Sequence, residues 1–427
     1  MKRRHQVVLF AVLLLSLTIL SPSFDFRGGP QNQDQDQEND TFPNAVSRNE
    51  NQQVPVEIVV SMSEGEFQVF STIAKQVAAA RMVEINLRNL ETDTYKKVLN
   101  DELAVGDSGD ILLLDSGDIQ GYAKRGHLYP LNATTLSKAL GDSISHLREK
   151  TEWNGYQWGM PFDFDPYVLA SRSNSVAEAG LERLPDNLDE WTRLINLVEN
   201  KTQKLLAINI NDSYAADAWL NEFGSGVAPS TLRNASESYT AGGYEQALQV
   251  LNRVQPYILA KDADPGFADK DMQEEALMVV TPFSQLVKGK PSLTKDRLPN
   301  RIMFKPLAPA TSRSFVITSG SHEAEQASRW IEGMTSASVQ SDWYQQAHHL
   351  PAQQQQLNVE SQKLSVEGQI MSGHGQEWFT SKTSEKSVLE NQGQLSPYQK
   401  KVQQFLQGEI SANQYVSGIL NIHQSSK

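Results

Sequence analysis

Strand-like and helix-like patterns alternate between residues 54 and 126, and this alternation restricts the fold more than any other feature of the sequence. Three short apolar runs typical of strands each precede a segment with apolar residues at helical spacing, at 56–60 and 67–80, 82–87 and 94–104, and 109–115 and 119–125. Such alternation is typical of βαβ units and predicts an α/β fold with a mostly parallel sheet. Ligands of such sheets bind beyond the carboxyl ends of the strands, which here are the loops 61–66 and 115–118.

The first 23 residues have the pattern of an export leader. Three cations at positions 2–4 precede an apolar run at 7–20, and small residues follow at 21–23. The run is short for a membrane span, which needs about 17–25 residues. Two alternatives stay open: a signal peptide that is removed, or an uncleaved anchor that holds the rest of the chain outside the cytoplasm.

Residues 24–53 are rich in Gln, Asn and Asp and predict a disordered linker. The run at 31–40 alternates acids with amides. It resembles a calcium loop only in this spacing, because the central Gly and the closing Glu of such a loop are missing. We therefore expect the folded body to begin at Val54.

Composition excludes several classes of function. The 427 residues allow two or three domains. A formal net charge of −13 argues against nucleic acid as a partner, because the phosphate backbone would be repelled. The absence of cysteine excludes disulfides, thiolate metal sites and a lipid-modified cysteine anchor. We expect no cofactor and no bound metal ion.

An enzymatic interpretation depends on two carboxylates. Asp163 and Asp165 would share one face of a strand, and such a pair serves glycoside hydrolysis when the spacing in space is right. The sequence contains no Gly-x-Ser-x-Gly elbow, His-Glu-x-x-His motif or phosphate loop. His348 and His349 are adjacent, so on a helix their rings would diverge, which predicts a surface pair rather than a zinc site. Glycoside hydrolysis stays a minor alternative.

Several segments, in order along the chain, carry a resemblance to a known family. The matching segments are GDI at 109–111, GYAKRGHLYPL at 121–131, WNGYQWGMPFDFDPY at 153–167, FKPL at 304–307, SFVI at 314–317, LP at 350–351 and FLQGEISANQY at 405–415. The chain resembles the family 1 extracellular solute-binding proteins, which are the maltose-binding-protein-like receptors of carbohydrate ABC transporters. It departs from the family in two places, since it lacks a lipid-attachment cysteine and has Thr281 where relatives carry Gly before Pro and an aromatic residue.

The resemblance implies a two-lobe periplasmic-binding-protein-like (type II) α/β fold with hinged lobes and a ligand cleft between them. One lobe would comprise 54–163 with 306–350, and the other 164–305 with 351–427. The implied function is to bind a sugar or oligosaccharide by hinge closure for an ABC importer, as a monomer with permease membrane subunits as partners. The alternative is a ligand-sensing domain for a membrane partner such as a histidine kinase.

A sugar site needs carboxylates to accept bonds from hydroxyls and aromatic rings to cover the C–H faces of the sugar. The candidate ligand contacts, several of them placed by the resemblance, are Asp115, Asp118, Asp165, Asp212, Tyr214, Phe283, Glu64 and Tyr398.

Some of these candidates have a structural alternative. Asp115 and Asp118 could instead cap a helix, and Asp165 could make a structural hydrogen bond. Phe283 could belong to the core, and Glu64 could lie in a solvated loop. For Asp165 we expect the change to Asn to weaken binding by about ten- to 150-fold, with little change in fold stability.

Overall fold

The computed structural model describes residues 54–92, 94–224, 227–228, 242–265, 275–288, 302–307, 311–363 and 397–425. The chain divides into two units, Met1–Gln52 and Gln53–Lys427, and all described residues belong to the second. The predicted leader at 1–23 and the predicted linker at 24–53 lie outside the described residues. None of the described helices is long and apolar enough to cross a membrane.

Strands and helices alternate from β1 to α4, as the sequence predicts for residues 54–126. The strands are β1 (Val56–Val60), β2 (Ile85–Asn89), β3 (Ile111–Asp115), β4 (Leu128–Tyr129), β5 (Glu152–Trp153), β6 (Tyr156–Gln157), β7 (Met160–Asp165), β8 (Tyr167–Arg172), β9 (Lys204–Asn209), β10 (Ile258–Lys261), β11 (Ala276–Pro282), β12 (Ile302–Pro306), β13 (Thr311–Thr318) and β14 (Leu350–Pro351).

The helices are α2 (Glu64–Arg81), α3 (Tyr95–Val105), α4 (Ile119–Lys124), α5 (Ala133–Asp142), α6 (Ser145–Lys150), α7 (Ser173–Ala177), α8 (Leu188–Val198), α9 (Ser213–Leu220), α11 (Gly242–Val254), α13 (Phe283–Val287), α14 (Ala324–Met334), α15 (Ala337–Ala347), α16 (Gln354–Lys363), α19 (Pro397–Leu406) and α20 (Ala412–Ser425), with 3-10 turns η1 (Asn221–Phe223) and η2 (Gln255–Tyr257).

The strands form two larger sheets and one hairpin. The seven-stranded sheet has the order β14-β7-β13-β3-β1-β2, with β4 pairing to β13, and the five-stranded sheet has the order β10-β9-β11-β8-β12. In the first, β1 runs parallel to β2 and β3, and in the second β9 runs parallel to β10 and β11. The strands that join the two sheets, β7, β8, β12 and β13, pair antiparallel to their neighbours.

The chain crosses between the two sheets at the prolines that the sequence singles out. Strand β7 of the seven-stranded sheet ends at Asp165, and β8 of the five-stranded sheet begins two residues later, after Pro166. The return crossing leads from β12, which ends at Pro306, to β13, which begins at Thr311. Neither proline donates a backbone N–H, although the Leu307 amide just after Pro306 still donates to the Tyr167 carbonyl at 2.7 Å.

Local sequence signals explain the differences between predicted and observed boundaries. Helix α2 begins at Glu64 rather than Phe67, because the Ser63 hydroxyl accepts a hydrogen bond from the Glu66 amide, 3.4 Å away, and also contacts the Glu66 carboxylate at 3.2 Å. This Ser-x-x-Glu pattern is a capping box. The second strand begins at Ile85 rather than Met82, because Met82 adopts a left-handed conformation that ends α2.

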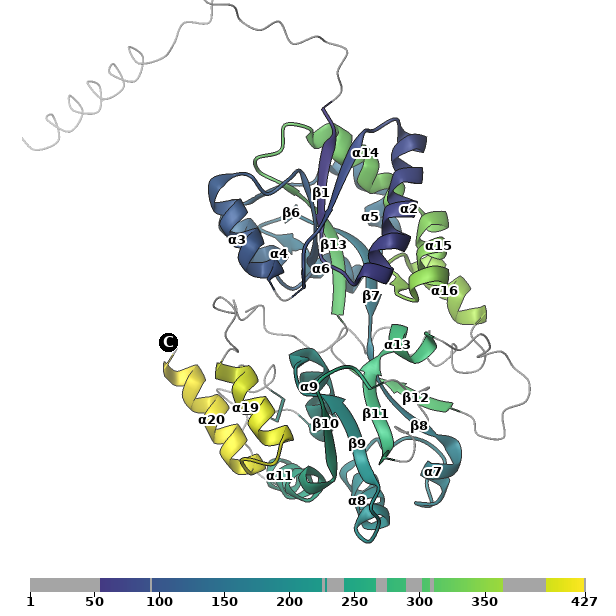
Figure 1. Ribbon diagram of the computed structural model, residues 1–427, viewed down its shortest axis with the longest axis vertical. Helices are drawn as coiled ribbons and strands as arrows, with labels where there is room; N and C mark the ends of the chain where they lie inside the picture. The colour runs from purple at the N-terminus through teal and green to yellow at the C-terminus, as the bar shows by residue number, and fades with distance from the viewer. Residues whose placement is uncertain are drawn as a thin grey trace, which may run out of the picture. The chain divides into compact units, whose positions relative to one another are not determined.

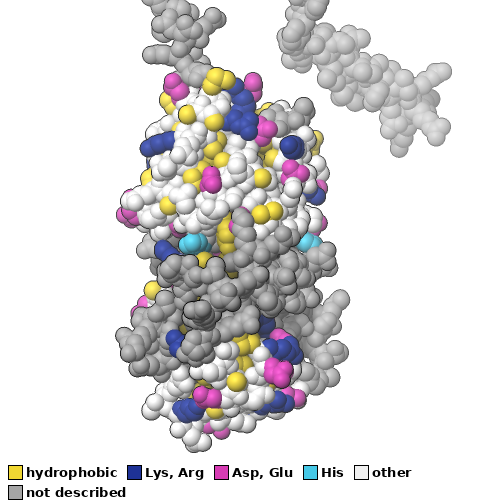
Figure 2. Space-filling view, turned by 90° about the vertical axis from the view of Figure 1, so that its right-hand side faces the viewer, with side chains coloured by type: hydrophobic (Ala, Val, Ile, Leu, Met, Phe, Trp, Pro, Cys, Tyr) yellow, Lys and Arg dark blue, Asp and Glu magenta, His cyan; other side chains and the backbone are white. Residues whose placement is uncertain are grey.

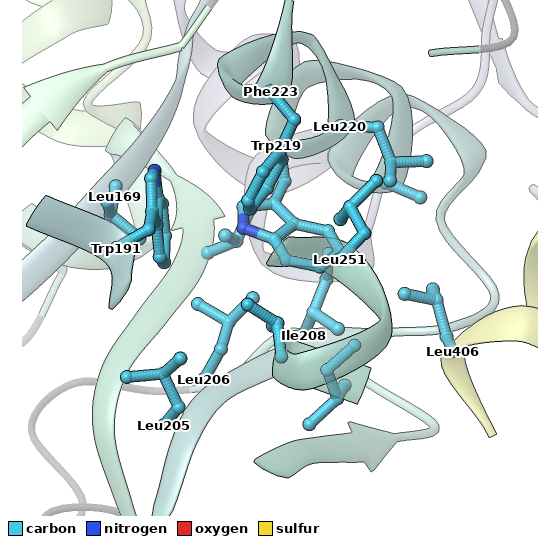
Figure 3. Close-up of a cluster of buried hydrophobic side chains, with 14 of the residues drawn as sticks. Leu169, Trp191, Leu205, Leu206, Ile208, Trp219, Leu220, Phe223, Leu251 and Leu406 are labelled. Atoms are coloured by element: carbon cyan, nitrogen blue, oxygen red, sulfur yellow. The ribbon is translucent and has the colours of Figure 1, made fainter. Parts of the chain in front are cut away.

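The helices cover both faces of each sheet. Figure 1 shows α2, α14 and α15 on one side of the seven-stranded sheet and α3 and α4 on the other, and a separate hydrophobic cluster fills each interface. Against the five-stranded sheet, α8, α9 and α11 pack together with the C-terminal helices α19 and α20. Figure 3 shows part of this core, where the rings of Trp191, Trp219 and Phe223 lie 5.1–6.5 Å apart. Trp219 is fully buried.

A further hydrophobic cluster spans the crossing between the sheets. It contains Phe164 and Leu350 from the seven-stranded sheet, and Val168 and Phe304 from the five-stranded sheet. The crossing therefore lies in a packed apolar environment. Polar groups within it need internal partners, because water cannot supply them.

Candidate functional site

The carboxyl ends of the parallel strands in both sheets lie next to the crossing at Pro166. In the seven-stranded sheet, Arg313 of β13 pairs with Asp115 at the end of β3 and with Asp163 near the end of β7. In the five-stranded sheet, Pro282 at the end of β11 pairs with Tyr167 at the start of β8. We call the segments 63–66, 115–118, 163–165, 211–214 and 282–284, together with His349, the junction.

A network of charged side chains holds the first part of the junction together. The Arg313 guanidinium donates to both carboxylate oxygens of Asp163, with its Nε 3.0 Å from Oδ1, and its Nη1 lies 3.3 Å from Glu66 Oε1. His349 Nε2 lies 2.9 Å from the same Glu66 oxygen. The Trp343 indole N–H completes the set with a 2.8 Å bond to Asp163. The network joins α2, β7, β13, α15 and the segment before β14.

Burial and oppositely charged neighbours shift the pKa values of Glu66 and His349 in opposite directions. Burial opposes ionisation of Glu66, but the hydrogen bond from His349 and the charge of Arg313 outweigh it and hold the pKa of Glu66 well below its usual value. Burial and Arg313 oppose protonation of His349, whereas Glu66, Asp163 and Asp165 favour it, and the pKa of His349 is raised. The contact between Glu66 and His349 therefore favours the charged form of each side chain.

Asp165 joins the two sheets rather than facing solvent. Its Oδ1 accepts a hydrogen bond from the Ser284 amide at 2.9 Å, and its Oδ2 accepts one from the Ser284 hydroxyl at 2.5 Å. Ser284 lies in α13, which follows β11 of the five-stranded sheet. The residue is 9% exposed. The expectation that Asp165→Asn changes fold stability little assumes a carboxylate without internal partners, and that assumption is wrong.

The loop after β3 holds two acidic candidates in different environments. Asp115 accepts a 2.8 Å hydrogen bond from the Gly117 amide, and burial together with the charge of Asp118 raises its pKa. Asp118 stands at the first position before α4 but makes no capping hydrogen bond, and its carboxylate lies 3.5 Å from the Lys96 ammonium. The capping alternative therefore does not describe Asp118, whose carboxylate is directed toward a cation.

Asp212 is the residue that caps a helix. Its Oδ1 accepts hydrogen bonds from the amides of Tyr214 and Ala215, at 3.0 and 3.2 Å, at the start of α9. Its Oδ2 accepts a 2.6 Å hydrogen bond from the Tyr167 hydroxyl. Burial raises its pKa, although the Tyr167 bond opposes the change. Tyr214, in the first turn of the same helix, is 41% exposed and is the most accessible aromatic candidate.

The three remaining candidates are Phe283, Glu64 and Tyr398, and their environments differ. Phe283 is fully buried in the cluster at the crossing, with its ring 5.8 Å from that of Phe304. The stacking contact predicted for it has no support here, because no face of the ring is accessible. Glu64 is exposed in the first turn of α2. Tyr398 of α19 is partly buried against the core that contains α9 and α11.

Sequence reasoning missed His349 and Arg313. The prediction of a surface histidine pair is wrong for His349, because its side chain is only 13% exposed within the charged network and its ring stacks on Trp343 with 5.8 Å between centroids. Arg313 is named in no sequence pattern, although an arginine just before the apolar run 315–317 of a mostly buried strand signals a charged partner. Both residues lie far along the chain from their carboxylate partners.

Charged side chains are arranged differently on the described surface and in the network. Figure 2 shows acidic and basic side chains interspersed with hydrophobic ones on the face it presents. The carboxylates of the network are instead gathered around Arg313 and His349. Within the ranges that the structure describes, no group of three or more His, Asp or Glu side chains could hold a metal ion.

Two α/β sheets linked by crossing strands, with the strand ends of both at the crossing, define the two-lobe fold of periplasmic solute-binding proteins, as the sequence predicts. The family model for bacterial extracellular solute-binding proteins matches residues 72–363, which is more than half of the chain. The chain therefore belongs to the bacterial extracellular solute-binding proteins, and its family is one of binding proteins exported from the cytoplasm.

Solved structures and a curated protein add relatives at low identity. The GacH receptor of Streptomyces glaucescens matches with a TM-score of 0.65 at 14% identity over 87% of this chain and 98% of its own. The sugar-binding protein MalE of Xanthomonas citri matches with a TM-score of 0.66 at 13% identity over 87% and 97%. These identities show the fold alone.

A third structure and one sequence relative bind other small solutes. UgpB of Mycobacterium tuberculosis, in complex with glycerophosphocholine, matches with a TM-score of 0.64 at 15% identity over 88% and 98%. The erythritol/L-threitol-binding protein of Mycolicibacterium smegmatis is 26% identical over 144 residues, 30% of each chain. This chain therefore matches less than a third of that relative's length.

Proposed function

We propose that this protein is the substrate-binding component of an ABC importer and that it binds a sugar or oligosaccharide at the junction. The observation that carries the proposal is that strand ends from both sheets meet at the Pro166 crossing. Acidic side chains and an exposed tyrosine lie at these strand ends, and the chain belongs to a family of solute-binding proteins. The GacH receptor has been solved in complex with acarbose, and MalE is a sugar-binding protein, and both support a carbohydrate ligand for this chain.

The chemistry of the junction favours a neutral polyol over an anionic solute. Asp118 and Asp212 are carboxylates that accept bonds from hydroxyls, and Tyr214 offers an exposed ring to the C–H face of a sugar. A phosphate group near these acids would be repelled. We therefore propose Asp118 and Tyr214 as ligand contacts. The contacts predicted at Asp165 and Asp212 stay predictions, because in this structure both oxygens of each carboxylate already accept hydrogen bonds from the protein.

We propose that each large sheet with its helices forms one lobe, with the boundaries of 54–163, 306–350, 164–305 and 351–427 adjusted to where the strands change sheet. Closure of the lobes about the crossings would bury the ligand, and only a higher affinity for the closed form can drive that change. Small-angle scattering should then report a smaller radius of gyration with saturating sugar. An unchanged radius would contradict hinge closure.

We propose that the chain acts outside the cytoplasm as a monomer with permease subunits as partners. Its leader is either removed as a signal peptide or kept as a membrane anchor. A reporter that is active only in the cytoplasm, fused after Lys427, should then stay silent. Activity of that reporter would contradict export. We also propose that the protein binds an oligosaccharide without cleaving it. Mass spectrometry of the oligosaccharide after incubation with the protein tests this proposal.

A thermal-shift screen tests the ligand class. The panel contains maltose, acarbose, tagatose, erythritol and glycerophosphocholine, with amino acids as a control class. A sugar at 100 times its Kd should stabilise the protein by about 2.7 kcal/mol. A shift with the amino acids or glycerophosphocholine, and none with any sugar, would contradict the carbohydrate assignment.

A further inference from the structure

His349 occupies a buried position that its place in the sequence does not predict. His348 ends α15 in a left-handed conformation, with φ of 65°, and this turn leads the chain toward β14. The His349 ring then lies parallel to the Trp343 ring, at an interplanar angle of 17°, and its side chain is 13% exposed. The imidazole is thus held in one orientation before any proton is considered.

Both ring nitrogens of His349 face carboxylates. Nε2 lies 2.9 Å from Glu66 Oε1 in the first turn of α2, and Nδ1 lies 3.7 Å from Asp165 Oδ2 and 3.9 Å from Asp163 Oδ2 in β7. Arg313 of β13 brings a positive charge to Glu66 and Asp163 from the neighbouring strand. On the histidine's own segment, the adjacent ionisable group is His348.

This geometry distinguishes the two protonation states of the ring. A neutral imidazole that donates from Nε2 to Glu66 would direct the lone pair of Nδ1 at two carboxylate oxygens, which is repulsive. An imidazolium presents an N–H on both sides. The imidazolium also reduces the excess of negative charge. The carboxylates of Glu66, Asp163 and Asp165 exceed the single charge of Arg313 by two, and the protonated ring lowers that excess to one.

The same contacts extend to the five-stranded sheet. Asp165 Oδ2, which faces Nδ1, also accepts the hydroxyl of Ser284 in α13. We propose that His349 is a proton-dependent positioning residue: its imidazolium ties the first turn of α2 to Asp165 at the crossing between the sheets, and loss of the proton loosens that tie. The inference does not depend on which solute the protein binds.

The sign of the expected pH dependence follows from the contacts. Burial and Arg313 disfavour the charged ring, but Glu66, Asp163 and Asp165 outweigh them, so the pKa of His349 is raised above 6.5. A raised pKa means that this stabilisation is fully present below 6.5 and is lost as pH rises through the folded-state pKa. Each unit of elevation changes the folding equilibrium tenfold. For His348, burial lowers the pKa, so the two neighbours should titrate in opposite directions from 6.5.

Two measurements on the full chain test the proposal. The first is an NMR titration of the histidine Cε1–H signals between pH 5 and 9, with the signals of His348 and His349 assigned in the wild-type protein among those of the eight histidines. We expect His349 to titrate above 6.5 and His348 below it. The order of these two pKa values is read in the wild-type protein, so it is decisive even where a variant at His349 does not fold.

The second measurement is the melting temperature as a function of pH. The wild type should lose melting temperature relative to His349→Gln as pH rises above 6.5. His348→Asn should keep the wild-type slope in that range, because the lowered pKa of His348 places its own titration below 6.5. Parallel profiles for the wild type and His349→Gln, or a His349 that titrates at or below 6.5, would overturn the proposal.

Discussion

Replacing Ser284 with Ala removes the hydroxyl that joins α13 to Asp165 at the crossing. The Oγ–Oδ2 distance is 2.5 Å, and the acceptor is a carboxylate that burial isolates from water. The Ser284 amide still donates to Oδ1 in this variant, so one of the two bonds survives. Hydrogen bonds to charged groups contribute about 1.5–3 kcal/mol, and we expect the unfolding free energy to fall by this amount.

Asp165→Asn perturbs the same link from the other side. The amide keeps the size of the side chain but loses the charge that both Ser284 bonds and the His349 contact use. We expect a similar loss of about 1.5–3 kcal/mol. In the double variant the two losses should not add, because each removes the same interaction. The coupling free energy from the cycle should exceed about 1 kcal/mol.

Urea unfolding of the wild type, both single variants and the double variant measures this coupling. Ser312→Ala is the matched control, since the Ser312 hydroxyl is also buried near the crossing but has no hydrogen-bond partner among the described residues. We expect this control to change the unfolding free energy by less than about 0.5 kcal/mol. A coupling near zero, or equal losses for Ser284→Ala and Ser312→Ala, would refute the link between the sheets.

Other substitutions separate core, site and network. Trp219→Ala should cost about 3–5 kcal/mol in urea unfolding, because the ring is fully buried, whereas Tyr214→Ala should leave stability within about 0.5 kcal/mol and weaken sugar binding in calorimetry. Tyr167→Phe should destabilise by about 1.5–3 kcal/mol through loss of its bond to Asp212; an unchanged midpoint would contradict that bond. Because the pKa of Glu66 is lowered, its stabilisation is present above 4.5 and lost on acidification, so Glu66→Gln should flatten the acid limb of a melting-temperature profile.

The sequence predicts the fold because the signals for it are local. Alternating strand and helix patterns identify β1, β3 and α3 to within about two residues, and Asn154-Gly155 predicts the β5–β6 hairpin, in which both residues have positive φ. The prolines at 166 and 306 mark both crossings. The starts of α2 and β2 differ by three residues from the prediction, although the capping box that fixes the start of α2 is also a local pattern.

The site is less predictable because its contacts are not local. His349 and Arg313 lie far along the chain from Glu66, and no spacing rule relates an isolated histidine to a carboxylate on another element. The resemblance to solute-binding proteins locates Asp165 at the crossing but cannot show that Ser284 already occupies both of its oxygens. A residue's position follows from the fold, whereas its partners depend on side chains brought together only by folding.

Hydrogen–deuterium exchange with the sugar that gives the largest thermal shift tests the central claim most directly. If the ligand binds at the junction, it should protect backbone amides in both 61–66 with 115–118, from the seven-stranded sheet, and 209–214, from the five-stranded sheet. Tyr214→Ala should reduce this protection at matched sugar concentration, whereas exposed Tyr156 in the β5–β6 hairpin provides a control when changed to Ala. Protection confined to one sheet, or located away from all of these strand ends, would contradict binding between the two lobes.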